Sequence, residues 1–472
     1  MPFSDQSFLF VFLPVVLLLG LPLAGTRHFL GFLFASSLFF YFWSSGYHVL
    51  VLLLSIGFNY AGALSLEREP SRAKLTLLIA GNVGLLVFYK YIGFLLTQLG
   101  VPVAGGLGGW FHDLVLPLGI SFFCFQGISY LIDVYRGSVP AEHDFVRYGA
   151  YKSFFPQLIA GPIVRYTDVA ADLLSPQRSL DLFSAGAARF SHGLIKKLLI
   201  ADGVAGLADA AFSVPNAELN CLTAVVGSVA FALQIYFDFS GYSDMAIGLA
   251  MMLGVRFPEN FARPYSSATI TEFWRRWHIS LSSWFRDYVY KPLGGNRRGP
   301  VLTYCNLLIV FLLTGLWHGA AWTFLLWGLY HGLFLILERL ALGEKAKAMP
   351  QGWLRYVYAL PVVLVGWILF RAADLGQAGA FLAAMASPFA ANSFDVLPAV
   401  RAAMSPQVLV IFLGAMAIFV MPRAPSHAAW LFRSTDRPLM AATRMAYMSA
   451  CFTVAATIAF SQSYSPFLYW RF

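Results

Sequence analysis

One histidine inside a long apolar stretch is the first residue of this chain that could do chemistry. His318 lies in the string GLWHGAAWTF, between the apolar run 301–316 and a second apolar run. Polar residues at membrane depth are costly and therefore often functional. A neutral imidazole can act as a general base there, because its ordinary pKa is close to neutral. The alternative is a structural histidine that hydrogen-bonds between helices, an interpretation that suits His331 in the nearby string YHG.

A second histidine, His278, lies in the arginine-rich stretch 256–300. Apolar residues recur there at helical spacing, and three polar residues fall on the opposite face. The apolar set is Phe273, Trp274, Trp277, Leu281, Trp284, Phe285 and Tyr288, and the polar set is Arg275, Ser282 and Arg286. This pattern predicts one amphipathic helix at the cytoplasmic interface. The alternative for His278 is a solvated residue on that helix.

Two carboxylates form the third candidate group. Asp238 and Asp244 lie in the string YFDFSGYSD, with apolar residues on both sides. Together with Ser240, Tyr242 and Ser243 they predict either a cavity that contacts substrate or a structural polar network. The arginines that follow in the sequence could balance the two charges.

The composition places all these candidates in a membrane protein. Of the 472 residues, 59% are hydrophobic and 12% are charged, and the mean hydropathy is +0.68. Average soluble domains have about 25% charged residues, and a soluble protein could not bury this much apolar surface. The net charge of +9 is scattered over short loops, which is typical of membrane topology and not of nucleic-acid binding. The four cysteines lie in apolar runs without a CxxC pair, which argues against a disulfide framework or a zinc site.

Apolar runs of spanning length predict an all-α polytopic fold with roughly 10 to 12 transmembrane helices of about 20 residues each. These runs start near Phe8, Phe29, Tyr47, Leu75, Leu114, Leu198, Leu222, Val301, Trp322, Tyr356, Val408 and Met445. The short segment 153–162 predicts a re-entrant or interfacial piece that must be buried in protein. The loop 67–74 is basic, whereas 100–112 contains no Lys or Arg. This asymmetry predicts that 67–74 is cytoplasmic and that the N-terminus is external.

Taken together, these motifs closely resemble the membrane-bound O-acyltransferase (MBOAT) family, in its alginate O-acetyltransferase (AlgI-like) branch. The resemblance is carried by YFDFSGYSDMAIGLA, NFARPYSSATITEFWRRWHISLSSWFRDYVYKPLGGNR and GLWHGAAWTFLLWGLYHG. It extends to FSDQSFLFVFLPVVL near the N-terminus and to SPFLYWRF at the other end. The D-alanyl transferase (DltB-like) branch shares much of the pattern.

The resemblance implies a single membrane domain over 1–472, with a catalytic core at about 153–340. The implied fold is a ring of transmembrane, re-entrant and interfacial helices around a central funnel. His318, in the WHG motif, is the implied catalytic residue, and His278 is its implied polar partner. We expect the donor or substrate to contact Trp317, Asn306, Asp238, Tyr242, Arg275 and Arg276.

The resemblance also implies the reaction and its participants. Acetyl-CoA would be the cytoplasmic donor, with no bound cofactor, no metal and no nucleic acid. The implied product is an O-acetylated, alginate-like exopolysaccharide made at the bacterial inner membrane. A periplasmic SGNH-type acetyltransferase and polysaccharide export machinery are the implied partners.

Several alternatives remain open at this stage. The acyl group could be D-alanine, and the acceptor a teichoic-type polymer, a lipid or a protein. A membrane transporter is the alternative from another class, although the hydropathy pattern has no internal repeat. The basic residues of 256–300 could contact the phosphates of the donor or serve as ordinary cytoplasmic anchors. Since no Ser or Cys lies in a nucleophile motif, direct transfer is favoured over an acyl-enzyme.

Overall fold

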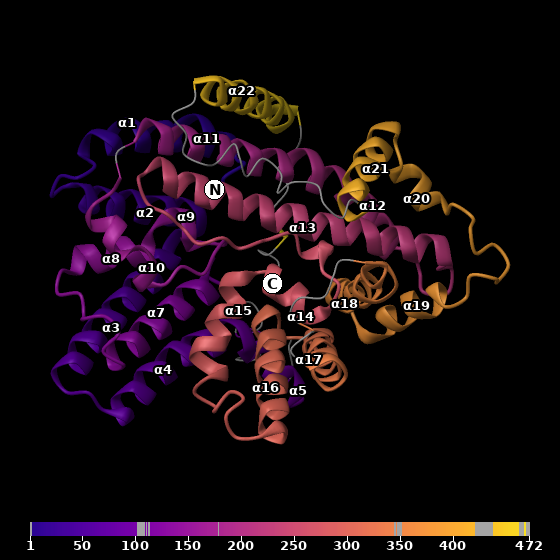
Figure 1. Cartoon of the computed structure of the whole chain (residues 1–472), viewed down its shortest axis with the longest axis horizontal. Coiled ribbons are helices and arrows are strands. Elements are labelled where there is room, and N and C mark those ends of the chain that lie inside the picture. Colours follow the sequence, from indigo (N-terminus) through magenta and orange to yellow (C-terminus); the bar gives the residue numbers. More distant parts are fainter. Residues whose placement is uncertain are drawn as a thin grey trace. The chain divides into compact units, whose positions relative to one another are not determined.

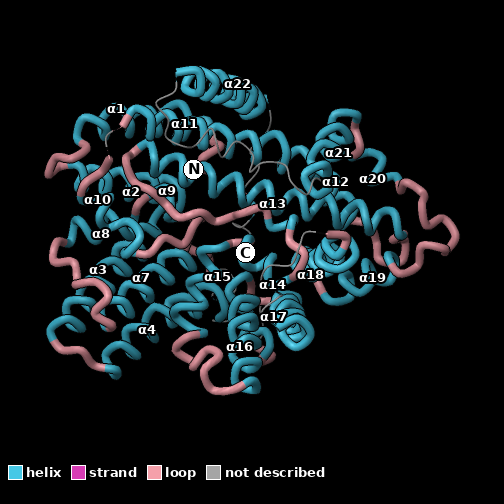
Figure 2. Tube along the Cα trace, in the orientation of Figure 1, coloured by secondary structure: helices cyan, strands magenta, loops and turns pink. Residues whose placement is uncertain are grey.

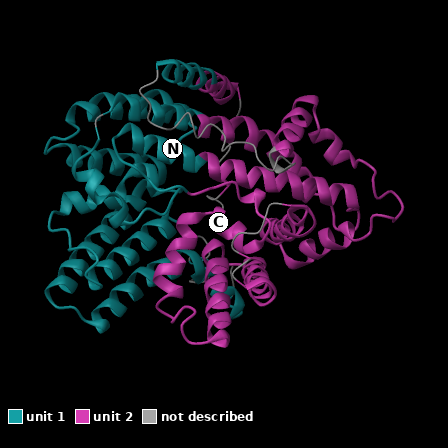
Figure 3. Cartoon of the chain, in the orientation of Figure 1, with its two compact units in different colours: residues 1–191, 242–259, 431–450 teal, residues 192–241, 260–430, 451–472 magenta. Residues whose placement is uncertain are grey.

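The computed structural model describes residues 2–101, 114–177, 179–343, 352–420, 438–461 and 467–468, and the single residues 109, 111 and 346. Throughout these residues the regular elements are helices, as Figure 2 shows. The chain divides into two compact units (Figure 3). Unit 1 comprises 1–191, 242–259 and 431–450, and unit 2 comprises 192–241, 260–430 and 451–472. Both candidate histidines therefore belong to unit 2.

Unit 1 contains most of the N-terminal helices. They are η1 (Phe8–Phe12), α1 (Leu13–Leu23), α2 (Phe29–Ser45), η2 (Gly46–His48), α3 (Val49–Arg68), α4 (Arg72–Leu86), η3 (Val87–Tyr91), α5 (Ile92–Gln98), α7 (Ile120–Tyr135), α8 (Phe145–Ser153), α9 (Phe155–Leu158) and α10 (Tyr166–Leu174). Helix α7 packs against both α3 and α4 (Figure 1). Almost all of its residues are buried, so this helix forms much of the interior of unit 1.

The segment 153–162 is buried throughout in unit 1. It contains only the one-turn helix α9, and the amide of Phe155 donates to the Ser37 hydroxyl at 3.1 Å. Protein surrounds this non-spanning backbone, which is the condition for such a segment at membrane depth.

Unit 2 contains the helices that carry the candidate site. They are η4 (Lys196–Ala201), α12 (Asp202–Phe212), η5 (Pro264–Ser266), α14 (Ile270–Arg276), α15 (Ile279–Phe285), η6 (Arg286–Tyr290), α16 (Pro300–His318), α17 (Trp322–Leu342), η8 (Arg355–Ala359), α18 (Leu360–Arg371), α19 (Leu375–Met385), α20 (Pro398–Ala403) and α21 (Pro406–Val420). Three further helices, α11 (Leu180–Ile195), α13 (Cys221–Met252) and α22 (Pro438–Ser461), each have residues in both units.

Helices α16 and α17 form a close hairpin, which determines where His318 lies (Figure 1). A Cβ added to Gly315 would lie 2.3 Å from the carbonyl oxygen of Phe324. A Cβ added to Gly328 would lie 2.3 Å from the carbonyl oxygen of Phe311. Small residues allow this backbone approach between membrane helices. Because α16 ends at His318, the packing of this hairpin fixes the position of the imidazole.

Six stretches of the described chain are long and apolar enough to cross a membrane. They are Phe29–Arg68, Arg72–Gln98, Cys221–Met252, Pro300–His318, Trp322–Leu342 and Pro438–Ser461. The first of them contains both α2 and α3, and four further apolar helices are shorter: Phe8–Leu23, Ile120–Tyr135, Leu375–Met385 and Pro406–Ala417. The predicted all-α polytopic membrane fold is confirmed, while a count of 10 to 12 spans would require some of these shorter helices to cross.

Candidate active site

The stretch around His278 is not one continuous amphipathic helix, so that prediction is wrong. Helix α14 ends at Arg276 and α15 starts at Ile279. Between them His278 adopts the left-handed conformation, with φ 46° and ψ 55°, which costs a non-glycine residue about 1–2 kcal/mol. The division into faces is nevertheless correct, because the aromatic residues are buried while Arg275 and Arg286 are exposed.

Backbone hydrogen bonds hold this break in place. The amide of Ile279 donates to the carbonyl of Asn260 at 2.9 Å, and the amide of Ala262 donates to the carbonyl of Arg276 at 2.9 Å. The segment 260–262 therefore lies along the junction between α14 and α15 and is hydrogen-bonded to it before and after His278. A left-handed residue persists only where the surrounding structure determines it, and these two bonds supply that constraint.

The N-terminus of α14 is fixed by two carboxylates. Thr269 caps the helix by accepting from the amide of Glu272 at 3.0 Å, and Glu272 accepts from the amide of Ala268 at 2.8 Å. Glu338, on α17, accepts from the amides of Ile270 and Thr271. Carboxylates are favourable at helix N-termini because they satisfy the free N–H groups there. The carboxylate of Glu338 thus connects the start of α14 to α17, and the other end of α14 leads into His278.

The side chain of His278 is completely buried, with 0% of its surface exposed. Its Nδ1 atom lies 3.1 Å from Oδ1 of Asn260, which also accepts from the amide of Ser280 at 3.3 Å and from its hydroxyl at 2.9 Å. The Nε2 atom is buried and makes no hydrogen bond in the described structure. Burial lowers the pKa of His278 to about 3, so the imidazole is neutral near pH 7.

His318 lies in an aromatic environment built by three helices. Its ring packs edge-on against Trp327 of α17 and Phe370 of α18, with centroids 5.0 Å away in both cases. Only 3% of its surface is exposed. An imidazole in this position can take a proton from a substrate hydroxyl if it is in its neutral form.

Trp317 brings the two histidines into one site. Its ring centroid lies 4.8 Å from that of His318 and 5.9 Å from that of His278. Phe239, on α13, packs edge-on against His278 with centroids 4.6 Å apart. The structure thus gathers His278, Trp317 and His318 from α16 and the junction between α14 and α15.

Asp238 has partners typical of a structural polar network. Its Oδ1 lies 2.8 Å from Nζ of Lys197, which also pairs with Asp202 at 2.7 Å. Its Oδ2 accepts from the amide of Leu468 at 2.7 Å. These contacts favour the structural alternative over contact with substrate.

Asp244 also has a close ion-pair partner. In unit 1 it pairs with Arg189, at 3.0 Å. Lys197 and Arg189 both precede the two aspartates in the sequence. The ion pairs seen here thus come from residues that precede the aspartates, and not from the arginines that follow them.

The remaining predicted residues have contacts of their own, or are exposed. Tyr242 belongs to unit 1, where its ring stacks on Phe3 with centroids 4.7 Å apart. Asn306 donates to the carbonyl of Gly295 at 3.0 Å and so anchors the loop that precedes α16. Arg275 is exposed, whereas Arg276 pairs with Glu272 at 2.6 Å and donates to the Ser266 hydroxyl at 2.9 Å.

Sequence reasoning missed two residues that hold this site together, Asn260 and Glu338. Glu338 is a lone carboxylate near the end of an apolar helix, and the rule that singled out Asp238 could have found it. Asn260 carries no such signal, since a single Asn in a loop is common.

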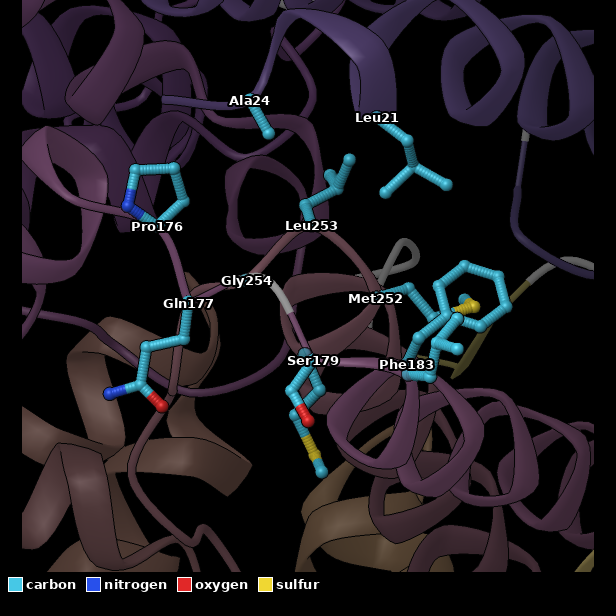
Figure 4. Close-up of a pocket in the computed structure, with 11 residues that line it drawn as sticks. Leu21, Ala24, Pro176, Gln177, Ser179, Phe183, Met252, Leu253 and Gly254 are labelled. Carbon is cyan, nitrogen blue, oxygen red and sulfur yellow. The ribbon is translucent and has the colours of Figure 1, made fainter. Parts of the chain in front are cut away.

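A hollow of about 340 Å³ lies in unit 1 (Figure 4). It is lined mainly by apolar residues, among them Leu21, Phe183, Met252 and Leu253. None of its lining residues is among the predicted site residues, so this hollow is not part of the candidate site.

Comparison with known proteins shows the family of this chain. The model of the MBOAT, membrane-bound O-acyltransferase family matches residues 138–371, which include both histidines. A probable alginate O-acetylase AlgI from Pseudomonas putida is 39% identical over 492 residues, covering 100% of both chains. Its counterpart from Pseudomonas syringae is 43% identical over 397 residues, 82% of this chain and 75% of that protein.

A relative that is named for another acceptor also matches most of the chain. A peptidoglycan O-acetyltransferase from Helicobacter pylori is 37% identical over 415 residues, 80% of this chain and 78% of that protein. The residues of the candidate site and the similarity over most of the chain lead to one assignment. The chain belongs to the membrane-bound O-acyltransferase family and is an O-acyltransferase.

Proposed function

We propose that this chain is an inner-membrane O-acetyltransferase that uses cytoplasmic acetyl-CoA to O-acetylate an alginate-like exopolysaccharide. The observation that carries the proposal is the pair of buried imidazoles, His278 and His318, both in ring contact with Trp317. Relatives named alginate O-acetylase support the choice of acetyl group and polymer. Direct transfer needs a base and no protein nucleophile, and a buried histidine of this pair can supply the base.

In the proposed transfer step, His318 accepts the proton of the acceptor hydroxyl as that oxygen attacks the thioester carbonyl carbon. The C–S bond then breaks, and coenzyme A leaves as a thiolate that recovers the proton from the imidazolium. The surrounding rings of Trp327 and Phe370 exclude water, which limits hydrolysis of the thioester.

The basic segment from the end of α14 to the start of α16 supports a cytoplasmic, anionic donor. Its exposed cations are Arg275, Arg286, Lys291, Arg297 and Arg298. Arginine and lysine bind phosphate groups through charge-assisted hydrogen bonds, and coenzyme A carries several phosphates. Because acetyl-CoA is too polar to cross lipid, we propose that its thioester end enters from this basic side. The acceptor enters from the periplasmic side, where an SGNH-type transferase and the polymer export machinery would take the acetyl group onward.

Radiolabelled acetyl-CoA supplied to membranes containing the protein tests this proposal. We expect label to appear in exported alginate-like polymer when the periplasmic transferase is also present. A His318→Gln variant of equal abundance should abolish the signal. Label in peptidoglycan alone would replace the proposed acceptor, and transfer of D-alanine in place of acetyl would contradict the proposed donor. Movement of an unmodified solute across the membrane, without covalent transfer, would support the transporter alternative.

A further inference from the structure

Asn260 accepts three hydrogen bonds with one side-chain oxygen. Oδ1 lies 3.3 Å from the amide nitrogen of Ser280, 2.9 Å from its hydroxyl and 3.1 Å from Nδ1 of His278. A backbone N–H can only donate. The atom that faces the Ser280 amide must therefore be the oxygen of the Asn260 amide, which fixes the orientation of this side chain without reference to the histidine.

The orientation of Asn260 determines which nitrogen of His278 carries hydrogen. An oxygen that only accepts requires a donor at Nδ1, so the proton must be on Nδ1. The Ser280 hydroxyl lies 3.4 Å from Nδ1 and already donates to Asn260. It can therefore act only as a second acceptor toward this proton. In the neutral ring, Nε2 is left with a lone pair.

The structure leaves that lone pair unused. Nε2 of His278 is buried and makes no hydrogen bond in the described part of the chain, and its ring is bordered by Phe239 and Trp317. A buried polar atom without a partner, on a residue with strained backbone, calls for a functional explanation. A substrate group that donates a hydrogen bond would satisfy it.

We propose that Asn260 is a positioning residue that holds His278 in the Nδ1-protonated form, so that Nε2 accepts a hydrogen bond from a second hydroxyl of the acetyl acceptor, next to the attacking hydroxyl whose proton goes to His318. The assignment rests on the proposed function. It excludes one role for His278, because Nε2 without hydrogen cannot donate to the thioester carbonyl. His278 therefore helps to hold the acceptor molecule, while His318 takes the proton of the attacking hydroxyl, and His278 does not act on the donor carbonyl.

The tautomer can be read directly by nitrogen-15 NMR of the histidine-labelled full-length protein in detergent or lipid near pH 7. Comparison with a His278→Gln variant identifies the His278 signals among those of the 9 histidines. We expect the pattern of a neutral ring protonated at Nδ1. A ring protonated at Nε2 in the unmodified protein would overturn the proposal. The NMR measurement of the tautomer requires no turnover. Its result therefore tests the role of Asn260 independently of the proposed acetyl transfer.

Two variants of Asn260 test the consequence for turnover. Asn260→Leu keeps a similar volume but removes the acceptor, so Nε2-protonated His278 should appear and kcat should fall by roughly 10²-fold or more. The KM for acetyl-CoA should stay close to normal. Asn260→Asp keeps the acceptor and should restore the tautomer and most of kcat. Asn82→Leu, which removes a buried amide paired with Asn59 in unit 1, controls for general damage. A folded Asn260→Leu protein with unchanged tautomer and kcat would overturn the proposal.

Discussion

The carboxylate of Asp238 accepts a hydrogen bond of 2.7 Å from the amide of Leu468, which lies 230 positions further along the chain. The neighbouring residues extend this contact toward the site. Phe239 packs against both Phe467, with centroids 6.0 Å apart, and His278. The hydrogen bond from the Leu468 amide to Asp238 therefore holds residues 467–468 against Phe239, which in turn contacts His278.

Replacing Leu468 tests this attachment. Leu468→Pro removes the N–H donor and should lower stability by about 1–3 kcal/mol, because a charged, buried acceptor loses a partner. Acetyl transfer should fall as Phe239 loses its support. Leu468→Ala retains the N–H and is the matched control. Thermal unfolding and labelled-acetyl transfer should separate the two variants, and equal behaviour would argue against the attachment.

The ion pair of Lys197 with Asp202 and Asp238 gives a test of whether Asp238 is structural. Lys197→Met removes the cation that pairs with the buried carboxylate of Asp238 and the half-buried one of Asp202, and it should cost about 3–5 kcal/mol. Adding Asp238→Asn to Lys197→Met should recover part of this loss. The measurement is thermal unfolding of the single and double variants. Unchanged stability of Lys197→Met would contradict the structural role of Asp238 and make a contact of Asp238 with substrate the better interpretation.

Glu338 should matter for activity although it lies outside the site. Glu338→Gln keeps one acceptor oxygen for two amide donors, so one N–H of α14 loses its partner at a cost of about 1–3 kcal/mol. The start of α14 should loosen, and turnover should fall because α14 leads into the His278 junction. Glu69→Gln, on an exposed carboxylate that pairs with Lys74, should change neither property. The measurements are the unfolding temperature and kcat of both variants. A Glu338→Gln protein that matches Glu69→Gln in both would contradict the prediction.

Arg275 and Arg276 should respond differently to substitution by alanine. Arg275 is exposed on the basic segment, so Arg275→Ala should raise the KM for acetyl-CoA with little change in kcat. Arg276 pairs with Glu272 and Ser266 inside unit 2, so Arg276→Ala should mainly lower thermal stability. An unchanged KM in Arg275→Ala would indicate that this arginine is an interfacial anchor.

Much of the fold and half of the site follow from local sequence features. Apolar runs are local, so they reveal the membrane helices and the depth of His318. The helical spacing of the aromatic residues gave no sign of the break at His278. The aromatic residues of α14 before the break and of α15 after it are both buried, so the pattern looks continuous in the sequence. A helical pattern does not report a single residue with positive φ.

Long-range partners could not be found from the sequence. Lys197 meets Asp238 from another helix, and Asn260 meets His278 from a loop 18 positions earlier. Such contacts depend on how the helices pack, and no spacing rule encodes them. The general rule that singles out polar residues within apolar runs selected Asp238, and the structure gives this residue an ion-pair partner.

His318 is the proposed general base, and His331 is a second buried histidine of the same helix hairpin with which it can be compared. His331 is buried against Trp274 and Trp327, so His331→Ala should reduce stability more than turnover. His318→Ala should fold and insert nearly normally, because a buried neutral histidine makes only a bond or two worth about 1 kcal/mol each. His278→Ala added to His318→Ala should reduce transfer little further if the two act as one unit.

The most direct measurement is the rate of labelled acetyl transfer by purified His318→Ala protein whose unfolding temperature matches that of the unmodified chain. Loss of a general base predicts a rate lower by roughly 10²-fold or more, with His318→Gln behaving in the same way. A well-folded His318→Ala protein that transfers acetyl groups at close to the normal rate would contradict the assignment and make His318 a structural residue of the aromatic cluster.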